Sequence, residues 1–404
     1  MRKWIQGFCS GNNYQIKQEN EIDPNDSAKL ETLWDAISGL LFAEPLVVAG
    51  LHAQHLSLAA KCGEPRQLIR SLCLEAIISS VEGVSSAKRC EKLMKHARQL
   101  SACSGEMESR SFVNLAEGTA SFLQVQMQKA LRFLSEAETQ FSNSPTKAWW
   151  ELDMIRSLTV WAHMHLGSYH HLELSIKRYL DDAEQRGDRM LISSIYSAGL
   201  PQLSLRDDNP CQATEVMRRM QSRFPVEVFQ QQHVSWLYSQ SQIDLYLGKG
   251  EVAWLRLNNN WPLLRRSMQL RNQFGRVSLI DLRGRCALQC GSKKMLENAK
   301  KDLKRLRREP GDWVRPYVSR LTAGIGEAEG RIDDAISDLA KSQVGFEEIG
   351  FKLCAAAVQM RRGALVQGED GQIAIALGTN QLEAEGVKSP AMMSRVLAYG
   401  LSLT

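Results

Sequence analysis

Turn signals recur along this chain at intervals of about 40 residues, with long stretches of helical periodicity between them. One series contains Glu44-Pro45, Gly83, a weak member near Val125, Gly167, Asp208-Asn209-Pro210, Gly248, Gly291, Gly330 and Asp370-Gly371. A second series falls roughly midway, at Gly63, Ser104-Gly105, Asn143-Ser144-Pro145, Gly187, Pro225, Asn272, Pro310-Gly311, Gly350 and Ser389-Pro390. Together they predict an all-α fold, a superhelical array of about nine antiparallel helical hairpins with a period of about 40 residues.

The periodicity begins after a polar lead-in over residues 1–24, so we expect residues 25–404 to form the repeat domain. Such an array escapes the size limit of a single core, roughly 250–300 residues, because each repeat packs only against its neighbours. Pro201 and Pro262 interrupt otherwise helical stretches, and we expect a kinked or split helix at each.

The segment QIDLYLGKGEVAWLRL, residues 242–257, is the clearest single hairpin. Gly248 permits a tight reversal, and the small Ala253, five residues later, lets the second helix cross the first closely. The same spacing returns at Gly330 and Ala335. A turn glycine followed by a small residue is typical of tetratricopeptide hairpins, whose usual period is 34, so this array is tetratricopeptide-like with longer helices.

The composition favours a cytoplasmic protein. The formal net charge is +5, too small for 404 residues to indicate a nucleic-acid or membrane partner by itself. Nine cysteines without a framework are typical of free thiols in a reducing compartment. The first residues lack the apolar run of a signal peptide, and no stretch reaches the roughly 18 apolar residues of a membrane span.

A basic segment at residues 292–309, SKKMLENAKKDLKRLRRE, is the strongest charge feature. Met295, Leu296, Ala299, Leu303 and Leu306 form an apolar stripe, which indicates a packed helix with a basic outer face. That face is either simply solvated or a docking patch for an acidic protein segment or nucleic acid. The absence of interleaved aromatic residues weakens the single-stranded nucleic-acid version. The candidate partner-binding residues are Lys300, Lys301, Lys304 and Arg308.

Residues that could support catalysis, a metal or a cofactor form no convincing pattern. His163 and His165 lie near His170 and His171, but residues two apart on a helix point to different sides. Cys286 and Cys290 lack the Cys-x-x-Cys spacing of a redox pair. Gly324 and Gly326 fall inside an expected helix, and no phosphate loop or kinase motif occurs. We therefore expect no catalytic activity, metal or cofactor.

Several stretches resemble the C-terminal helical region of large bacterial, eukaryotic-type serine/threonine protein kinases. They are EPLVVAGLHAQHLSLAAKCGEPRQLIRSLCLEA (44–76), QRGDRM (185–190), LRDDNPCQA (205–213), IDLYLG (243–248) and EAEGVKSPAMMSRVLAYG (383–400). In that architecture a kinase domain and a nucleotide-binding ATPase domain precede a tetratricopeptide-like array. Neither catalytic domain is present in these 404 residues, so no catalytic residue of the family maps onto them.

The resemblance implies a non-catalytic interaction or sensor scaffold of a kinase-type signalling system. Such a scaffold would bind a protein, for example a kinase, an ATPase or its substrate, or a small ligand, on a concave face lined by the first helix of each pair. Two alternatives stay open: a nucleic-acid-associated regulator that uses the basic helix at 293–308, or a piece of a serine/threonine protein kinase. No helix-turn-helix domain follows Pro390, which disfavours direct DNA regulation.

Overall fold

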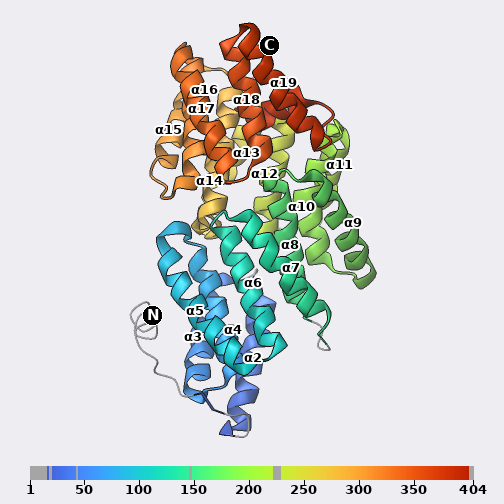
Figure 1. Cartoon of the computed structure of the whole chain (residues 1–404), viewed down its shortest axis with the longest axis vertical. Helices are drawn as coiled ribbons and strands as arrows, with labels where there is room; N and C mark the ends of the chain where they lie inside the picture. The colour runs from blue at the N-terminus through green and yellow to red at the C-terminus, as the bar shows by residue number, and fades with distance from the viewer. Residues whose placement is uncertain (1–15, 18–20, 42–43, 145–147, 222–228, 400–404) are drawn as a thin grey trace. The chain divides into compact units, whose positions relative to one another are not determined.

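The computed structural model describes residues 16–17, 21–41, 44–144, 148–221 and 229–399. It divides the chain into two compact units, unit 1 over 1–155 and unit 2 over 156–404. Nineteen α-helices and no β-strand occur among the described residues (Figure 1). The boundary between the units falls inside a helix, and the turn spacing gave no sign of this division.

The helices of unit 1 are α2 (Pro24–Leu40), α3 (Pro45–Cys62), α4 (Pro65–Ser80), α5 (Ala87–Ser104), α6 (Met107–Leu123), α7 (Met127–Ser142) and the start of α8 (Trp149–Leu166). Unit 2 contains the rest of α8, α9 (Tyr169–Arg186), α10 (Arg189–Arg206), α11 (Pro210–Gln221), α12 (Gln231–Tyr246), α13 (Gly250–Arg266), α14 (Gln273–Gln289), α15 (Lys293–Leu306), α16 (Arg315–Ala328), α17 (Ile332–Glu348), α18 (Lys352–Val366), α19 (Gly368–Ala384) and α20 (Pro390–Leu397). Each even-numbered helix up to α18 packs against the odd-numbered helix that follows it, which gives nine sequential pairs among the described residues. The prediction of an all-α array is confirmed, and α20 is left outside the pairs.

The predicted turns fall between these helices with few exceptions. Gly167, Gly248 and Gly330 adopt the left-handed conformation that ends one helix and starts the next. Val125, the weak member of the series, also has a positive φ of 64° and forms a real turn. The turn expected at Asp370-Gly371 is wrong, because α18 ends at Val366 and the reversal occurs at Gln367. Pro145 and Pro225 lie outside the described residues.

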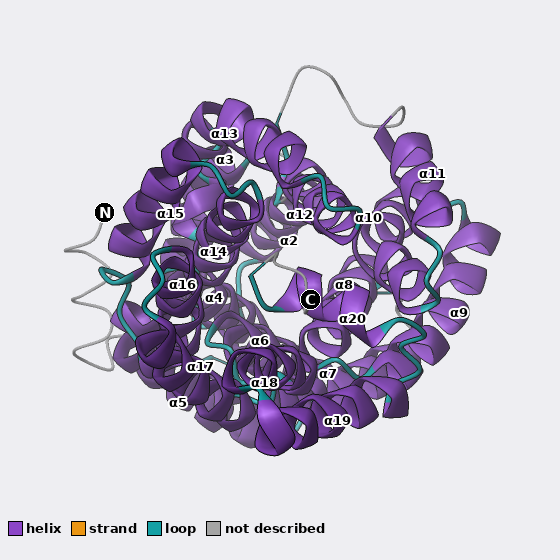
Figure 2. Ribbon diagram, turned by 90° about the horizontal axis from the view of Figure 1, so that it is seen from above, coloured by secondary structure: helices purple, strands orange, loops and turns teal. Residues whose placement is uncertain are grey.

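The two helices of a pair differ in how much of their surface is buried. In unit 2 the first helix of a pair is buried on most sides, as α14 is from Val277 to Leu288, whereas α15 buries a single stripe. Figure 2 shows α9, α11, α13, α15, α17 and α19 around the outside of unit 2. We call α10, α12, α14, α16 and α18 the inner helices. In the described ranges, no helix has both the length and the apolar character needed to cross a bilayer.

The prolines within helices do not divide them. Pro201 lies inside α10, and Pro262 lies inside α13. Both helices continue past the proline, so neither is split. Proline costs a helix one backbone hydrogen bond, and packing of the remaining turns offsets that loss.

Unit 1 holds its first three pairs together with a buried arginine. The guanidinium of Arg70 on α4 lies 5.3 Å from the ring centroid of Trp34 on α2 and 5.0 Å from that of Phe112 on α6. It also donates to Glu31 of α2 at 3.2 Å and to Glu108 of α6 at 2.6 Å. One side chain therefore joins the first helices of three consecutive pairs through cation–π contacts and charge-assisted hydrogen bonds.

Glycines allow α18 and α19 to approach each other closely in unit 2. A Cβ atom on Gly363 would lie 2.5 Å from the carbonyl oxygen of Gly371, and one on Gly378 would lie 2.6 Å from that of Ala356. Backbone atoms cannot move aside as a flexible side chain can. Gly371, which the sequence suggested was a turn residue, is thus a packing residue.

We predict that Gly363→Ala lowers the free energy of unfolding by about 1–3 kcal/mol, because the added methyl group overpacks this crossing. Gly326→Ala is the matched control: its Cβ would lie 3.5 Å from the nearest atom, the backbone oxygen of Arg331. That change should be neutral or stabilise by up to about 1 kcal/mol. Chemical denaturation followed by circular dichroism measures both, and equal stability of the two variants would contradict the packing argument.

Candidate interaction surfaces

Helix α20 lies on the inner side of unit 2, although it belongs to no pair. It packs against α18, α12 and α19, and Figure 2 shows it among the helices of this unit, inside the outer helices. Met393 and Val396 of α20 are completely buried. Figure 2 shows the inner helices inside the outer ones, and α20 packs against two of these inner helices, α12 and α18.

Three buried charged side chains hold the carboxyl end of α20. Arg285 of α14 donates from Nε to Oδ2 of Asp281 at 2.8 Å, and Arg320 of α16 donates from Nη2 to the same oxygen at 2.6 Å. Their remaining donors reach α20: Arg285 donates to the carbonyl oxygen of Val396, and Arg320 donates to that of Leu397 at 2.5 Å. All three charged residues are at most 3% exposed.

The charges in this cluster are unbalanced without α20. Two guanidinium groups and one carboxylate carry a net charge of +1. The last carbonyl groups of a helix have no partner within it and carry partial negative charge. Burial disfavours the charged form of Arg320, but the pKa of Arg320 is raised, with the charge and hydrogen bond of Asp281 among the main causes. The end of α20 therefore supplies the negative charge that the two arginines require.

A second polar contact fixes the residue that follows α20. Tyr399 donates its hydroxyl to Glu327 of α16, and Arg361 of α18 donates to the same carboxylate from Nε at 3.0 Å. The ring of Tyr399 needs space beside α16, and Gly324 provides it: a Cβ there would lie 3.0 Å from the tyrosine Cγ. Gly324, which the sequence placed inside an expected helix, thus accommodates an aromatic ring.

The first and last pairs of unit 2 meet, so the array of this unit closes on itself. The backbone N–H of Tyr169, at the start of α9, donates to Glu385 just after α19 at 3.0 Å. In the linker before α20, the N–H of Lys388 donates to the carbonyl oxygen of Arg206 at 2.8 Å. These two bonds hold the linker between α19 and α20 across the closed array of helices and direct α20 inward.

The predicted basic helix is α15, and its basic face points outward. Met295, Ala299, Leu303 and Leu306 are buried, as predicted, while Leu296 is half-buried. Two of the segment's acids turn inward: Asp302 pairs with Arg283 of α14 at 2.5 Å, and Glu309 pairs with Arg276 at 2.7 Å. Glu309 therefore balances a charge outside α15, and Asp302 divides its charge between Arg283 and Arg305, so the outer face is more basic than the sequence alone indicates.

The four candidate residues on this segment differ in their surroundings. Lys300 is bound by Glu297 at 2.6 Å and by Glu329 at 2.9 Å, so its charge is already paired. Lys301, Lys304 and Arg308 are exposed and, within the described part of the chain, form no ion pair. Arg308 lies just beyond the end of α15. Three of the four are thus available to an acidic partner.

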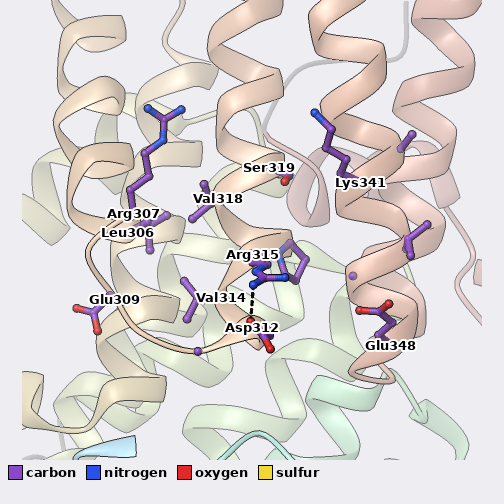
Figure 3. A pocket seen from close by; sticks show the side chains of 15 residues that line it. Leu306, Arg307, Glu309, Asp312, Val314, Arg315, Val318, Ser319, Lys341 and Glu348 are labelled. Carbon is purple, nitrogen blue, oxygen red and sulfur yellow. Dashed lines mark ion pairs between the residues drawn. The ribbon is translucent and has the colours of Figure 1, made fainter. Parts of the chain in front are cut away.

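A groove of about 870 Å³ runs beside this face, between the end of α15, α16 and α17. Its lining is Leu306, Arg307, Glu309, Gly311, Asp312, Val314, Arg315, Pro316, Val318, Ser319, Ala340, Lys341, Val344, Gly345 and Glu348. Figure 3 shows Arg307 and Lys341 toward one end, Glu309 and Glu348 toward the other, and the ion pair of Arg315 with Asp312 between them. The groove therefore combines an apolar lining with one basic end.

The histidines and cysteines singled out in the sequence differ in burial: His170 and His171 are exposed, His163, His165 and Cys290 are half-buried, and Cys286 is buried. The ring of His163 stacks on that of His171 with 5.5 Å between ring centroids. The ring of His165 meets that of Phe274 with a centroid distance of 4.7 Å. Burial lowers the pKa of His163 to about 4 and raises the pKa of the Cys286 thiol. No group of three or more His, Cys, Asp or Glu side chains that could hold a metal occurs among the described residues.

Sequence reasoning missed the Asp281, Arg285 and Arg320 cluster. The available signal was a pair of opposite charges four residues apart within the apolar stretch VSLIDLRGRCAL, residues 277–288. Charged residues in a helix that is buried on most sides need partners. No such rule, however, indicates that the partner is the end of a helix more than a hundred residues later.

Comparison with protein-family models and with curated protein sequences finds no match to this chain. The functional argument therefore depends on the fold and on the surfaces described above.

We predict that Asp281→Asn lowers the free energy of unfolding by about 3–5 kcal/mol, because it leaves two buried guanidinium groups without their carboxylate. Asp338→Asn is the control, since Asp338 pairs with the exposed Lys341 at 2.9 Å on the surface of α17. Its loss should cost at most about 1 kcal/mol. Urea unfolding of both variants measures the difference, and a smaller effect at Asp281 than at Asp338 would show that the cluster is not needed.

Proposed function

We propose that this chain is a non-catalytic scaffold that binds a protein partner through an acidic, partly apolar segment. The observation that carries the proposal is the outer surface of α15–α17. There Lys301, Lys304 and Arg308 are exposed and form no ion pair among the described residues, and they belong to the same segment as Leu306 and Arg307, which line a groove with several apolar side chains. A segment with carboxylates and aliphatic side chains matches both parts, since it can pair with the cations and bury apolar area in the groove.

The spacing of charges supports one continuous basic rim. Lys301, Lys304 and Arg308 recur at helical intervals of three and four, so they lie on one side of α15 and the turn that follows it. Arg307 lines the groove, and Lys341 of α17 lines it from another helix. A partner segment in the groove would thus meet positive charge from two helices.

A protein partner fits this surface better than a nucleic acid. The groove lining contains no aromatic residue on which a base could stack. A nucleic-acid-associated regulator remains the second candidate, and it makes a different prediction about salt dependence.

The wider context comes from the resemblance to the helical region of serine/threonine kinases. In this proposal the pairs are tetratricopeptide-like hairpins, and the partner belongs to a kinase-type signalling system, as a kinase, an ATPase or a substrate. The small residues at the predicted crossings support the hairpin part, since Ala253 and Ala335 are both completely buried.

The test replaces three cations together, as Lys301→Glu, Lys304→Glu and Arg308→Glu. We predict that a partner captured from the source cells by the tagged native chain is lost from this variant by at least about tenfold, because like charges would meet across the rim. The matched control is Lys88→Glu, Lys92→Glu and Lys95→Glu on α5, an exposed stripe with the same change in net charge. Quantitative mass spectrometry of the captured proteins is the measurement.

A partner that is retained by the α15 variant, or lost equally from the α5 control, would contradict the proposed surface. The nucleic-acid alternative is tested with a duplex DNA probe at 50 and 200 mM salt. Binding that falls by orders of magnitude over that range, and that disappears in the α15 variant alone, would favour the regulator instead.

A further inference from the structure

We infer that the inner surface of unit 2 is a receptor for the carboxyl end of a helix, and that α20 is its intramolecular, exchangeable ligand. This inference rests on the proposed binding function, since it names a second surface of the scaffold and the chemistry of the segment that fits it. It differs from that proposal in its location, because the inner helices form this surface and α15–α17 form the other.

The contacts of α20 are those of a bound segment. It follows a linker with a left-handed residue, Gly386 at φ 83°, and belongs to none of the nine helix pairs in the described residues. Arginines from α14 and α16 bind its terminal carbonyl groups, and Glu327 with Arg361 binds the following tyrosine. Charge-assisted bonds to backbone carbonyls recognise the end of any helix, so they do not depend on most of the side chains of α20.

Recognition of side chains is confined to a few positions. Met393 and Val396 are completely buried, while the hydroxyl of Tyr399 donates to a carboxylate. The surface therefore fits a short helix that has an apolar stripe, whose terminal carbonyl groups are not bound within its own segment, and that is followed by a tyrosine. A partner segment with these three properties would compete with α20 for the same cluster.

Helix α20 also buries a polar group that gains nothing from being covered. The hydroxyl oxygen of Ser394 on α20 is buried and has no hydrogen-bond partner among the described residues. Burial of an unpaired hydroxyl costs free energy that contact with water would return. This lowers the net cost of releasing α20 compared with that of opening an apolar core.

The experiment uses the full chain with a protease site inserted after Lys388, within the linker. After cleavage, a fluorescein-labelled peptide of residues 389–404 is added, and its anisotropy reports exchange with the unlabelled segment. We expect the labelled peptide to bind the cleaved chain at least about tenfold more tightly than the uncut chain, whose tethered α20 competes at high effective concentration. The cleaved chain should keep its helical circular dichroism throughout.

Two peptide variants define the specificity. Tyr399→Ala removes the contact with Glu327 and should weaken binding to the cleaved chain by about tenfold or more. Ala391→Gln is the matched control, because Ala391 is exposed on α20, and it should bind as the native peptide does.

Failure of the labelled peptide to exchange, or equal binding of the Tyr399→Ala peptide, would overturn the inference. Loss of helical signal when the cleaved segment is removed would also overturn it, because α20 would then be part of the core. None of these results depends on the basic rim of α15, so they leave the proposed function to be judged by its own test.

Discussion

Unit 2 depends on an imbalance of charge at its centre. Asp281 can neutralise only one of the two buried guanidinium groups beside it, Arg285 and Arg320. An uncompensated buried charge is costly, and among the described residues no second carboxylate forms an ion pair with Arg285 or Arg320. The carbonyl groups at the end of α20 do so instead, and this requires the linker before α20 to turn inward across the closed array. The placement of the last described helix thus follows from electrostatics as much as from apolar burial.

The pairing of charges inside unit 2 also determines the charge of its outer surface. Arginines of α14 draw Asp302 and Glu309 inward, where Arg283 also lies over the ring of Trp261 at 3.7 Å. Carboxylates used in this way no longer balance the lysines of α15. The outer face of α15 is therefore mainly basic, although Lys300 pairs with Glu297 and Glu329. The arginines of α14 therefore have two effects. They form the buried ion pairs that join neighbouring helices, and they leave an exposed surface suited to acidic partners.

Much of the fold could be predicted from the sequence, because each turn is a local event. Gly248 and Gly330 adopt a positive φ because of the residues next to them in the sequence. The turn at Val125 has no glycine, but the spacing of the other turns predicted it. Gly371 was misread because a glycine required for close packing looks the same as one required for a turn. For the surfaces, the exposed lysines of α15 followed from periodicity. The cluster at Asp281 did not, since its partners come from distant helices and from backbone atoms that carry no sequence signal.

Hydrogen–deuterium exchange of the intact chain tests the central claim most directly. If α20 is a bound segment, its amides should exchange through local release, markedly faster than the amides of α12, α14, α16 and α18. Exchange of the inner helices should stay near the rate set by global unfolding. Exchange of α20 only together with the inner helices, at the same rate and with the same dependence on denaturant, would contradict the claim.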